Sequence, residues 1–269
     1  MIQSVELRKS YGSNEVLRDV SLTIQKGEVF GFVGSNGSGK TTFLKCLAGI
    51  ARPDSGSLDI CGVNVLKNPL AARKRLGYAP GETSLYESMR VKGFLSFCLS
   101  FYKSADFSGA LQMVETFGIP LHQRVRALSH GMKRKLLLTQ AIASGGEVIL
   151  LDEPMEGLDP EARRKVEAII RDCASQGRTV FFSSHDLSSV ERVCDRVGFL
   201  RNGELMRCGA LEEILSEASQ FLQLSFQEEN REKVFAALKG IPAEVSAVSG
   251  DLEDVFASLY GPEGKEGKQ

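Results

Sequence analysis

An excess of charge of either sign is missing from this sequence. Its 269 residues include 33 Lys and Arg against 34 Asp and Glu, which gives a net charge of -1 and a pI near 6.4. Proteins that bind nucleic acid through their overall charge carry a basic domain or a basic stripe. No part of this chain supplies one of convincing size, so we expect no nucleic-acid partner.

Paired cysteines are missing as well. The six cysteines lie far apart, with no C-x-x-C pair and no Cys/His cluster at the spacing of zinc ligands. This excludes a disulfide framework and a zinc ribbon. We expect reduced, mostly buried thiols, as in a cytosolic protein. The cysteines are Cys46, Cys61, Cys98, Cys173, Cys194 and Cys208.

Long apolar runs are also absent. Residues 93–102 form one of the longest stretches without charge, which is far too short to cross a bilayer, and residues 1–6 do not resemble a secretion signal. We therefore expect that the chain itself does not span a membrane. There is no G-x-S-x-G elbow either, which argues against reading the Ser, His and Asp residues at 183–186 as a hydrolase triad.

What the chain does contain is a loop suited to a nucleoside triphosphate. Residues 34–42 fit the spacing G-x-x-x-x-G-K-[ST], between an apolar strand expected over 28–33 and a helix over 41–47. Backbone N–H groups and the helix N-terminus would bind phosphate there. Lys40, which we also count as catalytic, would reach the β- and γ-phosphates, and Thr41 would hold Mg²⁺. The expected nucleotide contacts are Ser35, Asn36, Gly37, Ser38, Gly39, Lys40, Thr41 and Thr42.

A second strand ends in two carboxylates. Residues 148–151 are a continuous aliphatic run followed by Asp152 and Glu153, and an acidic pair at that position is costly unless a cation neutralises it. Successive side chains of a strand point in different directions. We therefore expect Asp152 to face the Mg²⁺ held by Thr41, and Glu153 to polarise the attacking water.

The remaining pattern indicates an α/β protein. Short strands at 4–7 and 20–24 precede the phosphate loop, and further strands are expected at 57–60 and 76–79. Residues 85–146 have helical periodicity, with one apolar face running from 91 to 102. The strand at 148–151, a helix from 160 to about 173 and a strand at 179–182 form a βαβ unit. We expect further strands near 221–226 and 243–248, and helices near 229–238 and 251–259.

Residues 128–132, Leu-Ser-His-Gly-Met, followed by three basic residues and an apolar helix, resemble the signature sequence of the ATP-binding cassette (ABC) family. The sequence departs from the family's L-S-G-G-Q at His130 and Met132 but keeps Ser129 and Gly131, which the resemblance makes nucleotide-binding residues. Physically, a hydroxyl and a glycine at a helix N-terminus form an anion site. The alternative for this segment is a capped helix without a ligand.

The resemblance covers nearly all of residues 1–215 and implies further roles. Tyr11 matches the aromatic residue that stacks on adenine, and Asp159 lies in the loop that contacts a second cassette. His185 matches the switch histidine that contacts the γ-phosphate and orients the catalytic glutamate, Glu153. Asp159 is also a good helix N-cap, because Pro160 follows it.

One family position is altered. After residues 76–80 the family has a glutamine that contacts Mg²⁺, and this chain has Gly81 followed by Glu82. Two alternatives stay open: Glu82 replaces the glutamine as a metal ligand, which we favour, or water fills the coordination position.

The resemblance implies a RecA-like P-loop NTPase core with an N-terminal antiparallel β subdomain, an inserted helical subdomain at about 83–146, and a small C-terminal α+β unit. The domains expected are 1–215, the nucleotide-binding cassette, and 216–269, an accessory domain with a frayed tail.

The function implied is that of the ATPase subunit of an ABC transporter, with ATP and Mg²⁺ as cofactors. Its partners would be a second cassette and an integral-membrane permease that holds it at the cytoplasmic face. Residues 252–259 resemble an element of exporter-type bacterial cassettes and favour export. The alternatives are a soluble ABC ATPase acting on chromosomes or ribosomes, and a regulatory cassette that binds ATP without turnover.

Overall fold

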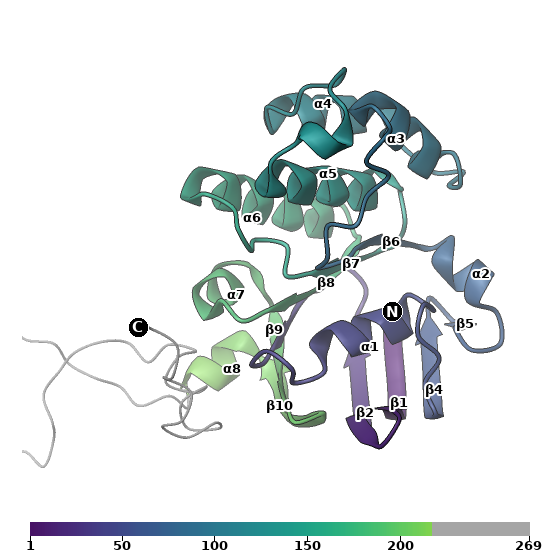
Figure 1. Cartoon of the computed structure of the whole chain (residues 1–269). Coiled ribbons are helices and arrows are strands. Elements are labelled where there is room, and N and C mark those ends of the chain that lie inside the picture. Colours follow the sequence, from purple (N-terminus) through teal and green to yellow (C-terminus); the bar gives the residue numbers. More distant parts are fainter. Residues whose placement is uncertain (217–269) are drawn as a thin grey trace, which may run out of the picture. The chain divides into compact units, whose positions relative to one another are not determined.

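The computed structural model describes residues 1–216. Contacts divide the chain into two units, Met1–Ala210 and Leu211–Gln269, and of the second unit only helix α8 (Leu211–Ser216) is described. The strands and helices expected between 221 and 259 lie outside the described residues. The first unit contains two sheets and the helices packed on them, and its elements are labelled in Figure 1.

An antiparallel sheet opens the chain, with the strand order β2-β1-β4-β5. β1 pairs with β2 on one side and β4 on the other, so Ile2 lies opposite both Ile24 and Ile60. The first two strands are longer than the sequence predicts, because irregular register at Glu6 and Asp19 lets pairing continue past their charged residues. The strands are β1 (Ile2–Tyr11), β2 (Asn14–Ile24), β4 (Ser55–Ile60) and β5 (Val63–Asn64).

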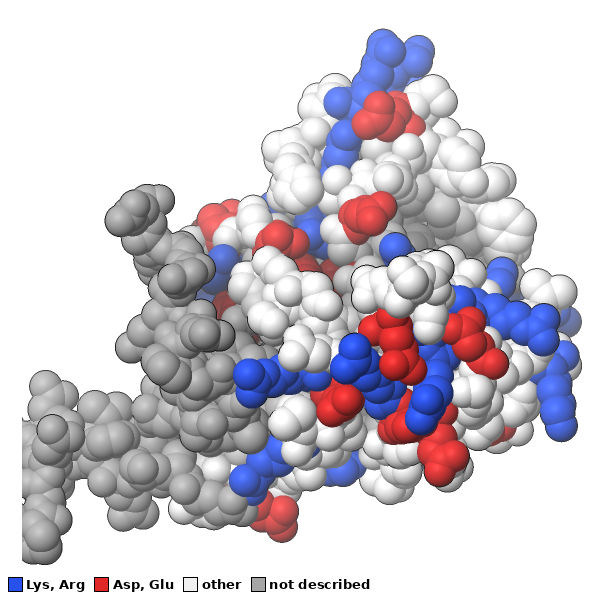
Figure 2. Space-filling view, turned by 60° about the horizontal axis from the view of Figure 1, so that its bottom comes forward, with Lys and Arg blue, Asp and Glu red and all other residues white. Residues whose placement is uncertain are grey.

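Opposite charges lie close together on this sheet and the turn beside it. Arg8 is ion-paired with Asp19, and the Lys9 ammonium is 3.1 Å from the Asp54 carboxylate. On the face seen in Figure 2, Lys and Arg side chains lie intermixed with Asp and Glu side chains. Neither sign of charge therefore forms a large block on that face.

The second sheet has the strand order β10-β9-β3-β8-β7-β6. Five of its strands are parallel and β10 is an antiparallel edge strand. β3, β7 and β8 are buried along their whole length, as expected for continuous apolar runs in a parallel sheet. The strands are β3 (Val29–Val33), β6 (Leu76–Ala79), β7 (Val148–Asp152), β8 (Thr179–Ser184), β9 (Arg196–Arg201) and β10 (Glu204–Ala210).

Helices complete this unit. α1 shares an apolar core with both sheets, in which the rings of Phe30, Phe32, Phe43 and Phe181 pack at centroid distances of 5.1 to 5.9 Å. Helices α3 to α6 lie beyond the other face of the parallel sheet in Figure 1. The helices are α1 (Lys40–Leu47), α2 (Pro69–Arg73), α3 (Val91–Leu99), α4 (Phe107–Thr116), the 3-10 turn η1 (Val125–Ala127), α5 (His130–Ala143), α6 (Pro160–Ser175) and α7 (Leu187–Val193).

The helical section between β6 and β7 contains α3, α4, η1 and α5. Most of the apolar face predicted for 91–102 is buried, and α3 ends at Leu99. Two members of that face, Cys98 and Tyr102, are only half-buried. Phe97 and Phe101 point to solvent instead. Within residues 1–216, no helix combines the length and apolar character that a bilayer crossing needs.

Candidate functional site

The site lies at one edge of the parallel sheet. β3, β8, β7 and β6 are adjacent and run in the same direction, so the segments that come after them emerge together. Those segments begin at Gly34, His185, Glu153 and Pro80. In open α/β sheets, ligands bind outside the carboxyl ends of the strands.

The phosphate loop joins β3 to α1 with little room for side chains. A Cβ at Gly34 would collide with the Leu200 carbonyl oxygen, and one at Gly39 would lie 2.8 Å from the Val16 carbonyl oxygen. Gly39 also has a φ of 111°, a conformation that favours glycine. The loop is therefore specified by backbone geometry as well as by its spacing. Ser38 is buried, whereas Ser35, Asn36, Gly37 and Thr41 are exposed and Thr42 is half-buried.

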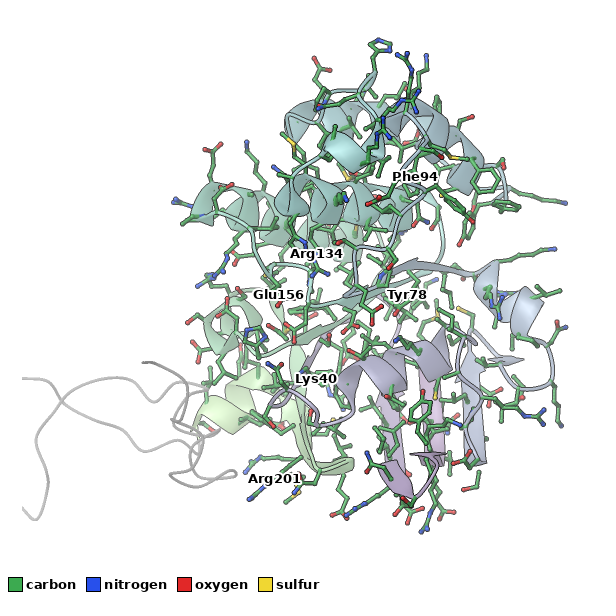
Figure 3. All side chains as sticks on the ribbon, in the orientation of Figure 1. Lys40, Tyr78, Phe94, Arg134, Glu156 and Arg201 are labelled. Carbon is green, nitrogen blue, oxygen red and sulfur yellow. The ribbon has the colours of Figure 1, made fainter. Side chains whose placement is uncertain are left out.

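Lys40 is the first residue of α1, and its ammonium is buried inside the loop (Figure 3). Its Nζ donates to the Gly34 carbonyl oxygen at 2.6 Å and to that of Ser35 at 3.2 Å, and lies 3.5 Å from Glu153 Oε1. The structure thus brings the predicted phosphate lysine to the predicted catalytic carboxylate.

Asp152 ends β7 and is 1% exposed. Its Oδ1 accepts a hydrogen bond from Ser183 Oγ at 2.6 Å, while its buried Oδ2 has no hydrogen-bond partner among the described residues. A buried carboxylate oxygen without a donor is costly unless a cation is bound, and oxygen ligands are those that Mg²⁺ prefers. The residues present therefore fit the predicted magnesium ion.

Glu153 is held in an unusual backbone conformation, with φ of 49°. Its N–H donates to Ser183 Oγ at 3.0 Å, and its Oε2 lies 2.9 Å from His185 Nδ1. Strained residues of this kind cluster at functional sites when their surroundings fix them. The pairing with His185, which is half exposed, matches the arrangement that the resemblance implies.

Ser183 is a site residue that no sequence motif predicts. Its hydroxyl accepts from the Glu153 N–H and donates to Asp152 Oδ1, so it links the two carboxylate residues. The signal for it is register, because Ser183 lies directly opposite Asp152 in neighbouring parallel strands. That pairing is not visible in a sequence.

In the altered segment at 81–82, Gly81 lies beside Asp152 and the Glu82 side chain does not. A Cβ on Gly81 would lie 3.0 Å from Asp152 Oδ2. The Glu82 side chain is 80% exposed, and its Oε1 is 3.9 Å from Lys45 Nζ. In this conformation Glu82 is paired with a lysine of α1. Nearby, burial and the charges of Asp152 and Glu82 raise the pKa of Tyr78, whose hydroxyl has no partner among the described residues.

The signature segment begins α5. Ser129 is its N-cap and accepts a hydrogen bond from the Met132 N–H at 3.2 Å. His130 Nδ1 lies 3.5 Å from Thr83 Oγ1, and a Cβ on Gly131 would lie 3.4 Å from the Gly157 carbonyl oxygen. Within residues 1–216 no hydrogen bond joins Ser129 or Gly131 to the phosphate loop.

Two further predicted residues lie at the ends of elements. Asp159 is the N-cap of α6, and the hydrogen bond from the Ala162 N–H at 2.8 Å lowers the pKa of its carboxyl group. Tyr11 ends β1 with its ring 52% exposed and the Lys9 ammonium 5.1 Å from the ring centroid. Both residues are on the surface of this unit.

Comparisons with known proteins agree with this geometry. The ABC transporter family model matches residues 17–156. The ABC transporter ATP-binding protein YtrB of Bacillus subtilis is 35% identical over 227 residues, which are 84% of this chain and 77% of YtrB. The Nod factor export ATP-binding protein I of Burkholderia orbicola is 35% identical over 209 residues, which are 76% of this chain and 69% of that protein.

Among solved structures, the dimeric structure of MJ0796, a bacterial ABC transporter cassette, superposes with a TM-score of 0.72 at 22% identity. The match covers 78% of this chain and 99% of that one. The fold is therefore that of a P-loop NTPase cassette, as predicted. The family match includes the phosphate loop and the strand that carries Asp152 and Glu153. From the geometry and these similarities we conclude that this chain is an ATP hydrolase and belongs to the ATP-binding proteins of ABC transporters.

Proposed function

We propose that this chain is the subunit that drives transport through a separate integral-membrane permease by hydrolysing ATP at the cytoplasmic face of the membrane. The observation that carries the proposal is the shared edge of the parallel sheet. There the phosphate lysine Lys40, the metal carboxylate Asp152 and the pair of Glu153 and His185 come together. This is the set of groups that phosphoryl transfer to water requires.

The phosphate loop and Lys40 bind the triphosphate, and the exposed ring of Tyr11 stacks on adenine. Thr41 and Asp152 hold Mg²⁺, which neutralises phosphate charge when bound. Glu82 is our third candidate ligand. It would have to leave Lys45 to reach the metal, so the Mg²⁺ dependence of a Glu82→Ala variant decides its role.

Glu153 orients the attacking water and accepts its proton, while His185 fixes the carboxylate. The hydrogen bond between His185 Nδ1 and Glu153 Oε2 supports these roles. The contact between Glu153 and Lys40 breaks when a phosphate takes the lysine. Glu153 is then free to accept a proton from water at the moment when ATP is bound.

A second cassette completes each nucleotide site. Ser129 and Asp159 lie on the surface as N-caps of α5 and α6, and Gly131 lies next to the loop that leads to Asp159. A helix N-terminus favours phosphate. In a two-fold pair, the signature of one chain would close on the ATP of the other. The likeness to the MJ0796 cassette, whose structure is dimeric, supports this arrangement.

A cluster of exposed apolar side chains provides the surface for the permease. Leu70, Tyr86, Phe97 and Phe101 are all exposed. The Phe97 ring makes edge-to-face contacts with Tyr86 at 5.3 Å and with Phe101 at 5.2 Å. Contiguous apolar surface of this kind marks protein interaction sites. All four residues line one surface hollow, and we call them the apolar patch.

Export is the direction we propose for transport. It is supported by the likeness to the Nod factor export protein and by residues 252–259, which lie outside the described residues.

The test compares binding to native membranes. The double variant Phe97→Glu, Phe101→Glu should lose membrane association and the cofractionating permease while the isolated chain still hydrolyses ATP. Val5→Glu, at an exposed apolar residue of β1, is the matched control and should stay bound. Unchanged membrane binding of the double variant would contradict the assignment of the patch, and a wild-type chain found only with ribosomes or chromosomes would contradict the transport function.

A further inference from the structure

Arg134 is the largest fully buried side chain in the described part of the protein. It lies on α5, five residues after the N-cap Ser129, and is 1% exposed. A guanidinium is charged at all ordinary pH values, and burying a charge is costly unless hydrogen bonds and an opposite charge compensate it. Its contacts therefore need an explanation.

Those contacts reach three separate segments of the site. Nη1 donates to the Pro80 carbonyl oxygen and to the Asp152 carbonyl oxygen, both at 3.2 Å. Nη2 donates to Glu156 Oε2 at 3.1 Å. Pro80 precedes Gly81, Asp152 is the proposed metal ligand, and Glu156 lies in the turn between β7 and α6. Figure 3 shows Arg134 on α5 directed toward Glu156.

Compensation of this buried charge is incomplete. The Glu156 side chain is 53% exposed, which weakens its interaction with the guanidinium. The Arg134 Nε is buried and has no hydrogen-bond partner among residues 1–216. A buried arginine whose acidic partner is half exposed is weak evidence for a contribution of the pair to stability. Stability alone therefore does not account for an arginine at position 134.

We propose that Arg134 is a positioning residue for hydrolysis, which fixes the turn at 80–81 and the Asp152 backbone relative to the signature helix. A planar guanidinium can hold two carbonyl oxygens with one nitrogen and a carboxylate with another. A lysine ammonium cannot reproduce this fork. The proposal rests on the metal-binding role proposed for Asp152.

The spacing between Gly81 and Asp152 depends on this arrangement. A Cβ at position 81 would lie 3.0 Å from Asp152 Oδ2, so small shifts of either segment change the surroundings of that oxygen. Because Arg134 bonds the carbonyl oxygens of Pro80 and Asp152 through one nitrogen, it sets the separation of these two segments. Loss of the fork should therefore act on metal binding first.

The test measures how much Mg²⁺ tightens ATP binding, together with hydrolysis, in Arg134→Met, Arg134→Lys and Glu156→Gln. In Arg134→Met we expect ATP binding without Mg²⁺ to remain close to wild type, since the phosphate loop is untouched. The gain in affinity that Mg²⁺ supplies should shrink severalfold, and kcat should fall by more than about tenfold. Arg134→Lys should recover only part of either loss.

The control is Arg178→Met. Arg178 is a half-buried arginine whose Nε donates to the Gly146 carbonyl oxygen at 2.9 Å, before the amino end of β7 and away from the site. Its loss should lower the melting temperature but leave the Mg²⁺ effect and kcat of the folded protein unchanged.

Equal behaviour of Arg134→Met and Arg178→Met, with the Mg²⁺ effect intact in both, would overturn the proposal and leave Arg134 a structural residue. If Arg134→Met does not fold, Glu156→Gln decides, because its half-exposed carboxylate can be replaced without opening the core. It should reduce the Mg²⁺ effect in the same direction, and an unchanged value would overturn the proposal. A wild-type chain whose ATP affinity does not respond to Mg²⁺ would instead contradict the metal site at Asp152.

Discussion

Glu153, the proposed catalytic base, is held by the fold in one backbone conformation. Its backbone adopts a left-handed conformation that costs energy in a residue with a side chain. The hydrogen bonds from its N–H to Ser183 hold that conformation. The side chain can then contact His185 through one oxygen and Lys40 through the other.

Replacing Glu153 by glutamine should separate binding from hydrolysis. The amide keeps the shape of the side chain and one acceptor oxygen for His185, but it cannot accept a proton from water. We expect ATP to bind with nearly unchanged affinity and kcat to fall by about two to four orders of magnitude. Calorimetric titration and single-turnover hydrolysis measure the two quantities, and equal turnover by variant and wild type would refute the role of Glu153.

The pair Gly81 and Glu82 allows a second test. If Glu82 leaves Lys45 to bind the metal, Glu82→Ala should raise the Mg²⁺ concentration for half-maximal hydrolysis severalfold. Gly81→Gln should preserve or lower that concentration, because it offers a neutral ligand beside Asp152. If water occupies the position, Glu82→Ala should leave the value unchanged. Lys45→Ala is the control that removes the partner of Glu82 without touching the turn.

At the scale of elements, secondary structure was predictable wherever apolar periodicity is strong. β6 has the predicted bounds, and β7, β8 and α1 differ from the prediction by one or two residues. β1 and β2 were underestimated because their charged residues, such as Arg8 and Asp19, are paired at the surface of the sheet. Residues 133–135 read as a basic run, yet the helix phase buries Arg134 between two residues with half-buried side chains.

The helix α4 depends on its N-cap, which is a local feature open to a simple test. Asp106 Oδ1 accepts a hydrogen bond from the Gly109 N–H at 2.8 Å. Asp106→Ala should destabilise the protein by about 1 kcal/mol. Asp106→Asn, which keeps an acceptor, should cost much less. Denaturant unfolding followed by circular dichroism measures both, and equal losses would show that the carboxylate charge, not the cap, matters.

For the whole molecule, the motifs predict which residues are catalytic but not how these residues meet. Lys40, Gly81, Asp152 and His185 are far apart along the chain and are joined only by the strand order β3-β8-β7-β6. That order results from packing of whole elements, which no local pattern encodes. Ser183 was missed for the same reason, since its role depends on the strand beside it.

We also predict that two copies of the chain pair when ATP is bound. The Glu153→Gln variant should form ATP-dependent dimers, because the exposed signature at the start of α5 can close on bound ATP while hydrolysis is blocked. Light scattering should show the mass doubling with ATP and not with ADP. Adding Ser129→Glu, which places a negative charge next to the partner's phosphates, should prevent it. A variant that stays monomeric at saturating ATP would contradict the shared site.

The Lys40 ammonium contacts oxygen atoms of the protein itself. It donates to the Gly34 and Ser35 carbonyl oxygens and lies 3.5 Å from the Glu153 carboxylate, and an ammonium has only three donors. An anion therefore enters the loop by exchange and must outcompete oxygens of the protein itself. A triphosphate with many oxygens can do so, whereas sulfate or inorganic phosphate offers too little, so both should compete weakly with ATP in a displacement assay. We therefore expect the loop to prefer a long polyphosphate over a single tetrahedral anion, because only the former offers enough oxygens to replace those that Lys40 contacts in the protein.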